Sequence, residues 1–204
     1  MTLPEQVRTL LAGPQPIPIV ATGDPVLRRP AEPYDWSLEP ELLTDLIAAM
    51  RVAMHAAPGV GLAAPQIGLG VQLAVIEDPA AIPADTASAR RRSPLPFRVL
   101  VNPSYRAVDG DSAAFYEGCL SVPGYQAVVE RASTVRLRAF DENGHAVDEV
   151  VTGWAARIVA HETDHLAGML YLDKAFTRSL TSNENYLARW AQPTPHGARL
   201  QLGF

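Results

Sequence analysis

The stretch that decides the fold is Ala160-His161-Glu162-Thr163-Asp164-His165-Leu166-Ala167-Gly168, which carries the pattern H-E-x-x-H. On a helix, residues four apart lie on one face, so His161 and His165 can present two imidazole nitrogens to one point. Glu162 lies about 100° round the helix from His161, where it can reach a water bound at that point without being a ligand itself. The pattern therefore predicts a helix with two metal ligands and a general base.

The residues around this motif indicate that the helix is buried. Trp154, Ile158, Val159 and Leu166 are apolar, and alanines occupy several of the remaining positions. A buried helix rarely carries His, Glu, Asp and His together unless these side chains are paired or bind a metal. A cluster of paired structural side chains is the alternative, and the spacing favours the metal site.

A catalytic metal site of this kind needs a third protein ligand and one open position. The longer pattern H-E-x-x-H-x-x-G-x-x-H is followed as far as Gly168, but Tyr171 stands where its third histidine would be. A glutamate from a following helix is a second solution, and Glu184 follows at a compatible spacing. A thermolysin-like metalloprotease with Glu184 as third ligand therefore remains open.

The third candidate ligand is Cys119, the only cysteine in the chain, within Glu117-Gly118-Cys119-Leu120-Ser121. A lone cysteine is most often a small buried hydrophobic residue. Gly118, however, lets the backbone approach closely, and Val122-Pro123-Gly124 supplies turn residues that can hold a short extended segment beside a helix. We therefore favour Cys119, as a thiolate, over Glu184.

Three segments occur in a fixed order along the chain: Gly59-Val60-Gly61-Leu62-Ala63-Ala64-Pro65-Gln66, Glu117-Gly118-Cys119-Leu120-Ser121 and His161-Glu162-Thr163-Asp164-His165-Leu166. The chain resembles a peptide deformylase, a family in which these segments read G-x-G-L-A-A-x-Q, E-G-C-L-S and H-E-x-D-H-L. All three match at their defining positions, and the resemblance covers roughly residues 17–176. Many members have Gln before the first histidine, where this chain has Ala160, a difference that leaves the ligands and the base unchanged.

The resemblance implies a role for each site residue. The implied metal ligands are Cys119, His161 and His165. The implied catalytic groups are Glu162, Gln66 and the Leu120 backbone N–H, and the implied substrate-binding residue is Gly61. Glu162 would take a proton from the attacking water and later protonate the departing amine. Gln66 and Leu120 would stabilise the oxyanion, and Gly61 would pack with Leu120 so closely that larger acyl groups are excluded.

The activity that the resemblance implies is metal-dependent hydrolysis of the N-formyl group of formyl-methionine on newly made polypeptides, with release of formate. The expected cofactor is one divalent ion, Fe²⁺, although zinc binds such ligands more tightly and a purified sample could carry zinc or nickel. The expected partners are N-formyl-methionyl nascent polypeptides, with room for transient contact with the ribosome. A non-catalytic protein with a structural metal is a weaker rival, because such sites normally have four protein ligands.

Composition and charge limit the classes of protein to which the chain can belong. With 204 residues, 48% hydrophobic and 19% charged, the chain fits one domain spanning residues 1–204, with residues 177–204 as a C-terminal extension. The formal charge of -5 argues against general nucleic-acid binding. No long apolar run and no secretory leader are visible, and a single cysteine suits a reducing compartment, so we expect a cytoplasmic protein without membrane contact.

The hydrophobic periodicity predicts an α+β fold, with mostly antiparallel strands around a central buried metal-binding helix and further N- and C-terminal helices. Helices are expected over residues 4–11, 37–57 and 182–190, with Ser37 as the N-cap of the second. Strands are expected over residues 71–76, 99–108, 127–129, 134–140, 146–151 and 169–172. Residues 79–96, which include Arg90-Arg91-Arg92, are expected to form a long mobile loop with a solvated run of charge.

Overall fold

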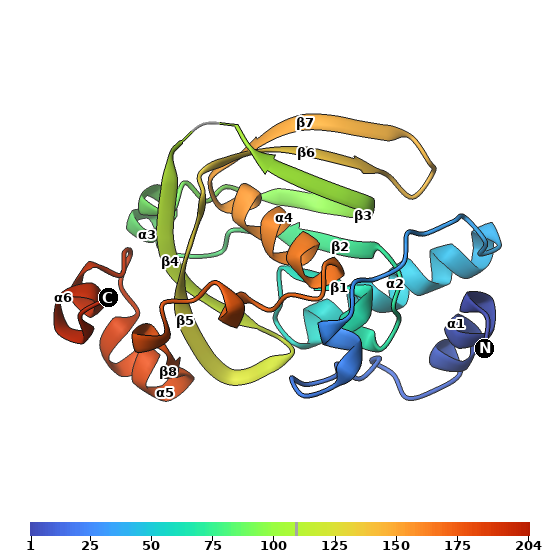
Figure 1. The fold of residues 1–204 in the computed structure, drawn as a ribbon, viewed down its shortest axis with the longest axis horizontal. Coiled ribbons are helices and arrows are strands. Elements are labelled where there is room, and N and C mark those ends of the chain that lie inside the picture. Colours follow the sequence, from blue (N-terminus) through green and yellow to red (C-terminus); the bar gives the residue numbers. More distant parts are fainter. Residues whose placement is uncertain (109) are drawn as a thin grey trace.

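The structure is a computed structural model, and it describes residues 1–108 and 110–204. Helix α4 (Gly153–Leu166) lies at its centre and is framed by two antiparallel sheets (Figure 1). The predicted α+β fold is therefore confirmed.

One sheet has five strands in the order β1-β2-β3-β6-β7, and the other has three in the order β4-β5-β8. The strands are β1 (Gly61–Ala63), β2 (Leu73–Asp78), β3 (Leu95–Ala107), β4 (Ser112–Cys119), β5 (Val122–Ala132), β6 (Thr134–Phe140), β7 (Ala146–Thr152) and β8 (Thr181–Ser182). The predicted strands over 134–140 and 146–151 are confirmed as β6 and β7, which pair as a hairpin with Gly144 at positive φ in its turn. Strand β4 was not predicted, because its sequence has no clear alternation of apolar and polar residues.

The central helix begins where only glycine fits. Gly153 has a φ of 64°, and a Cβ on it would lie 2.3 Å from the Arg91 carbonyl oxygen. From there α4 packs its apolar side chains, among them Ile158, Val159 and Leu166, against residues of the five-stranded sheet. Burial of such side chains stabilises the fold by roughly 1.5–3 kcal/mol each. Because the helix is buried, its polar residues require partners inside the protein.

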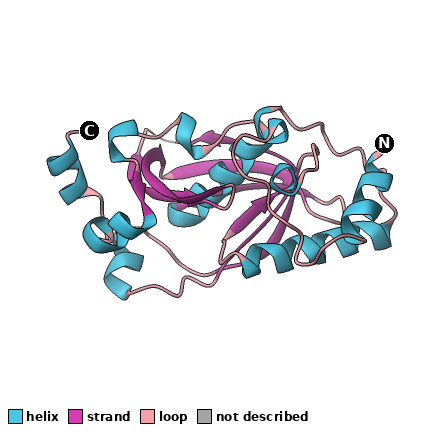
Figure 2. Ribbon diagram, turned by 90° about the horizontal axis from the view of Figure 1, so that it is seen from below, coloured by secondary structure: helices cyan, strands magenta, loops and turns pink. Residues whose placement is uncertain are grey.

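The remaining helices cover the two ends of the molecule (Figure 2). They are α1 (Leu3–Leu11), α2 (Pro40–Ala56), α3 (Ala84–Ala89), α5 (Asn183–Asn185) and α6 (His196–Leu202), with a π-helical turn at Tyr186–Trp190. Helix α2 starts later than predicted, with Glu39 and not Ser37 at the N-cap, because Pro40 suits the first turn. Among the described helices, none has the length and apolar character needed to cross a bilayer.

The prediction of a mobile, solvated loop over 79–96 is wrong. The segment contains α3. The Arg92 Nε and Nη2 donate hydrogen bonds to the buried carboxylate of Asp78 at 2.7 and 2.8 Å. Arg90 and Arg92 each lie 5.2 Å from the ring centroid of Trp154. A buried carboxylate needs a charged partner, and an indole ring attracts guanidinium groups, so two of these arginines pack against the protein.

The prediction of a strand over 169–172 is also wrong. Residues Tyr171–Asp173 form a 3-10 turn, in which the Asp173 carboxylate accepts a hydrogen bond from the Leu170 backbone N–H at 2.8 Å. This local bond competes with strand pairing. The helical prediction over 182–190 is confirmed in its range, although α5 passes into the π-helical turn. Helix α6 follows and was not predicted.

Candidate active site

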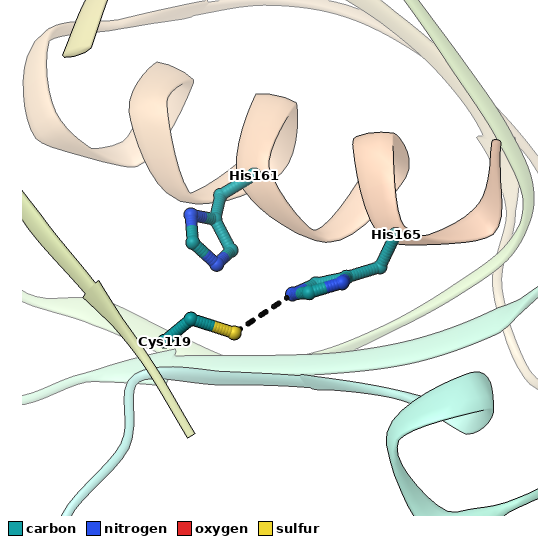
Figure 3. Close-up of side chains that lie close together, drawn as sticks. All are labelled: Cys119, His161 and His165. Carbon is teal, nitrogen blue, oxygen red and sulfur yellow. Dashed lines mark hydrogen bonds between the residues drawn. The ribbon is translucent and has the colours of Figure 1, made fainter. Parts of the chain in front are cut away.

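Three side chains from two elements meet at the C-terminal half of α4 (Figure 3). Cys119 comes from the end of β4, while His161 and His165 come from successive turns of α4. Their ligand atoms all lie within 4.8 Å of one another, and the Cys119 Sγ is 3.2 Å from the His165 Nε2. The structure therefore brings together the three predicted metal ligands.

Cys119 reaches this position because the β4–β5 hairpin changes register beside it. Gly118 pairs with Gln126, whereas Cys119 pairs with Val122, so the ladder is interrupted between the two residues. Such a bulge turns a side chain away from the direction that regular pairing would give it. The sulfur then lies opposite α4, as Figure 3 shows.

A buried carboxylate orients the first histidine. The Glu117 Oε2 lies 2.9 Å from the His161 Nδ1 and 3.0 Å from Arg131, while the Oε1 accepts from Arg131 at 2.7 Å and from Arg157 at 2.5 Å. Burial favours the neutral acid, yet the bonds from His161 and Arg131 hold the pKa of Glu117 well below its usual range. The carboxylate therefore accepts the Nδ1 proton of His161, which leaves the Nε2 lone pair free to bind a metal.

Asp164, the remaining acidic residue of the motif, extends this network. Its carboxylate accepts hydrogen bonds from Arg131 at 2.7 Å, from Lys174 at 2.7 Å and from the Tyr105 hydroxyl at 2.9 Å. Sequence reasoning missed Arg131 and Arg157 altogether, and it did not recognise Glu117 as the partner of His161. The signal was an acidic residue on a buried helix, which demands buried donors nearby but does not say where in the sequence they are.

Glu162 is buried beside the three ligands. The residue is 4% exposed, and within the described part of the chain its Oε2 has no hydrogen-bond partner. Burial raises the pKa of this carboxyl group to about 7. Gly61 makes room for it, because a Cβ on Gly61 would lie 2.2 Å from the Glu162 Oε1. Gly61, predicted as a substrate-binding residue, therefore also determines where Glu162 can lie.

Gln66 directs the donor end of its amide towards the sulfur. Its Oε1 accepts from the Ala63 backbone N–H at 2.8 Å, which leaves the Nε2 3.6 Å from the Cys119 Sγ and 3.3 Å from the Ser121 Oγ. The side chain is 1% exposed, so its orientation is fixed by these contacts. Leu120 follows Cys119 directly and lines the same pocket.

The site opens into a pocket of about 600 Å³. Five residues of α4 line one wall at helical spacing: Trp154, Arg157, Ile158, His161 and Glu162. The opposite wall comes from Gly59-Val60-Gly61 and from the β4–β5 hairpin. Glu184 is exposed on α5 and does not belong to the cluster of Cys119, His161 and His165.

Comparison with known proteins identifies the family. The family model described as polypeptide deformylase matches residues 16–180. The chain belongs to the polypeptide deformylase family. Peptide deformylase 3 of Streptomyces avermitilis is 64% identical over 202 residues, covering 99% of this chain and 90% of that protein. Peptide deformylase 1 of Streptomyces coelicolor is 62% identical, covering 99% of this chain and 93% of that protein.

Solved structures of deformylases share the fold. A crystal structure of a peptide deformylase from Synechococcus elongatus in complex with actinonin has a TM-score of 0.69 at 36% identity, covering 81% of this chain and 84% of that one. Deformylases are metal-dependent, and the residues of this chain fit a metal ion. One thiol and two imidazoles converge, the His161 Nδ1 is already engaged by Glu117, and a buried Glu162 oxygen has no partner among the residues that the structure describes.

Proposed function

We propose that this protein removes the N-formyl group from the formyl-methionine of newly synthesised polypeptides and releases formate. The observation that carries the proposal is the convergence of Cys119, His161 and His165 beside the buried carboxylate of Glu162, in an open pocket. Three ligands with an open position are typical of catalytic metal sites. The family assignment supports the same reaction.

In this proposal Cys119, His161 and His165 hold the cation. A divalent cation bound there supplies Lewis acidity, which activates water and polarises a carbonyl group. Glu162 accepts the proton of the attacking water and later donates it to the departing amine, a task that suits a carboxyl group with a pKa of about 7. The Gln66 Nε2 and the Leu120 backbone N–H donate to the oxyanion, and Gly61 restricts the acyl group to formyl.

The walls of the pocket support a peptide substrate. Strand β1 is the edge strand of the five-stranded sheet, and β4 is the edge strand of the other sheet. Residues of both edges, Gly61 and Gly118 among them, line the pocket. Unpaired strand edges bind extended peptides through backbone hydrogen bonds. A formylated peptide that enters between them would lie along β4 with its formyl group at the ligand cluster.

We further propose that residues 1–204 form one domain, and that the protein acts in the cytoplasm on nascent chains with transient ribosome contact. We also propose that the native cofactor is Fe²⁺. Anaerobic loading of the metal-free protein with iron, nickel or zinc, followed by assays before and after air exposure, tests the metal. Iron should give an active form that air inactivates through loss of metal or oxidation of Cys119, while nickel should resist. A fast, air-stable zinc form with an inactive iron form would contradict the iron assignment.

The reaction itself is tested by offering formyl-methionyl peptides and unblocked casein side by side. Deformylation without casein cleavage is expected. Casein cleavage would instead favour the metalloprotease, for which the exposed position of Glu184 gives no support.

A further inference from the structure

The two faces of the β4–β5 hairpin carry different side chains into one pocket. Glu117 bonds His161 of α4, and Phe115 packs on Trp154 of the same helix, so these residues face inward. The alternating residues of β4 must face outward, and Tyr116 indeed packs against Tyr186 with ring centroids 5.1 Å apart. The pocket therefore wraps around the edge of β4, because its lining includes residues of both faces.

The outer face is covered by the C-terminal segment. Strand β8 pairs with β5, which places Asn183 beside Gln126, and the Gln126 Nε2 donates to the Asn183 Oδ1 at 3.3 Å. Asn183 and Tyr186 both line the pocket that contains the ligand cluster. Both residues lie beyond residue 180, where the match to the family model ends. The C-terminal segment thus adds its own side chains to the substrate pocket.

We infer that Asn183 and Tyr186 form a subsite for the second residue of the substrate, directly after formyl-methionine; this inference rests on the proposed function. Successive side chains of an extended peptide point to opposite faces. A peptide added to the edge of β4 with its methionine facing inward, towards Ile158 of α4, must turn its second side chain to the outer face. Gly118 has no side chain there and is exposed, and a Cβ on it would lie 3.4 Å from the Gln126 Cγ, so the second side chain would pass beside Gln126 towards Asn183 and Tyr186.

The residues of this subsite define the side chains that it takes. Tyr186 is partly exposed and offers a ring face or edge, while Gln126 and Asn183 offer neutral amides. None of these three side chains carries a charge. Aromatic rings pair favourably with each other, and none of these three side chains would form an ion pair with a charged second residue. The subsite therefore favours a large uncharged second residue, aromatic above all, over glycine or glutamate.

The test compares amidated peptides formyl-Met-X-Ala in which X is Phe, Gly or Glu. For the wild-type protein we expect kcat/KM to be roughly 3–10-fold higher with Phe than with Gly, mainly through KM. Tyr186→Ala should bring the Phe-to-Gly ratio close to one, and Tyr186→Phe, which keeps the ring, should preserve it. Leu187→Ala is the matched control, because Leu187 is the next residue, is 73% exposed and does not line the pocket.

The outcomes separate this inference from the proposed function. A Phe-to-Gly ratio near one in the wild-type protein, or a ratio that survives Tyr186→Ala, overturns the subsite. An equal fall of kcat/KM for all three peptides in Tyr186→Ala, with wild-type kcat/KM values in Tyr186→Phe, would also overturn it. The ring would then act on the fold and not on the second residue. Absence of turnover with every formyl peptide, including the glycine peptide, would instead refute the proposed deformylase activity.

Discussion

The inner and outer faces of the β4–β5 hairpin differ in the contacts that their side chains make. On the inner face, Glu117 accepts four hydrogen bonds from Arg131, Arg157 and His161, so each charge has a partner in a fixed geometry. On the outer face, Tyr116 and Val128 pack with the C-terminal segment through apolar contacts. The inner face therefore specifies chemistry, whereas the outer face shapes the pocket and holds the chain end.

The largest expected effect lies on the inner face, at the sulfur. Cys119→Ala should lose both bound metal and activity, because two imidazoles remain from a three-ligand site. Metal content of the purified, reconstituted variant, measured by atomic emission, checks this. Glu184→Ala is the control and should keep both properties, since Glu184 is exposed and outside the cluster. If Glu184→Ala is the variant that loses its metal, the assignment of ligands fails.

Glu162→Gln should separate chemistry from metal binding. The amide has nearly the same shape and fits the space left by Gly61, so the variant should fold and retain stoichiometric metal. It cannot accept a proton, and we expect kcat to fall by more than the ~10²–10⁴ typical of general acid–base catalysis, because one group performs both transfers. Metal analysis and kcat on one preparation provide the measurement. Near-normal turnover would remove Glu162 from the mechanism.

The inner face was largely predictable from the sequence, because its chemistry depends on spacing. The i, i+4 relation of His161 and His165 follows from helix geometry alone. Cys119 was preferred from its glycine-rich context, and the resemblance of three segments supported it. Arg131 and Arg157 could not be assigned, since a buried acid predicts that donors exist but not which of the seventeen basic residues reach it.

The outer face and the 79–96 segment resisted prediction for a different reason. Their contacts are tertiary: Arg92 is fixed by Asp78, and Tyr186 by Tyr116 across the chain. A run of arginines is usually solvated, so local composition pointed to a mobile loop. Tertiary packing overrides such local preference, as it does where residues 169–172 turn and do not form a strand.

A weaker disturbance of the inner face should appear at Arg157. Its Nη1 bonds Glu117 and the Val129 carbonyl, and its Nη2 bonds the Ala113 carbonyl, so it ties α4 to both strands of the hairpin. Arg157→Met should lower metal affinity about 10–100-fold, the usual effect of losing a group that orients a ligand's partner. Competition with a chelator of known affinity measures the loss.

Arg90→Met is the matched control for Arg157. Both guanidinium groups lie over the Trp154 and Phe115 rings, but Arg90 donates to the carbonyls of Gln192 and Pro193 and not to Glu117. Metal affinity in this control should stay at the wild-type value. Equal losses in both variants would mean that packing around Trp154, and not the bond to Glu117, sets the position of the ligands.

The smallest effect should come from Ser179, which fastens the C-terminal segment to β5. Its hydroxyl accepts the Val128 backbone N–H at 2.7 Å and donates to the Phe176 carbonyl at 2.6 Å, and the residue is fully buried. In Ser179→Ala the Phe176 carbonyl keeps the Ser179 backbone N–H at 2.8 Å, but the Val128 N–H loses its acceptor. An unsatisfied buried donor costs about 1–3 kcal/mol, which urea unfolding measures as a lower free energy of unfolding.

Ser88→Ala, at an exposed position of α3, is the control and should change that free energy by less than about 0.5 kcal/mol. Metal affinity should be unchanged in both variants, because neither side chain reaches the inner face. A loss of metal in Ser179→Ala would show that the two faces of the hairpin are coupled.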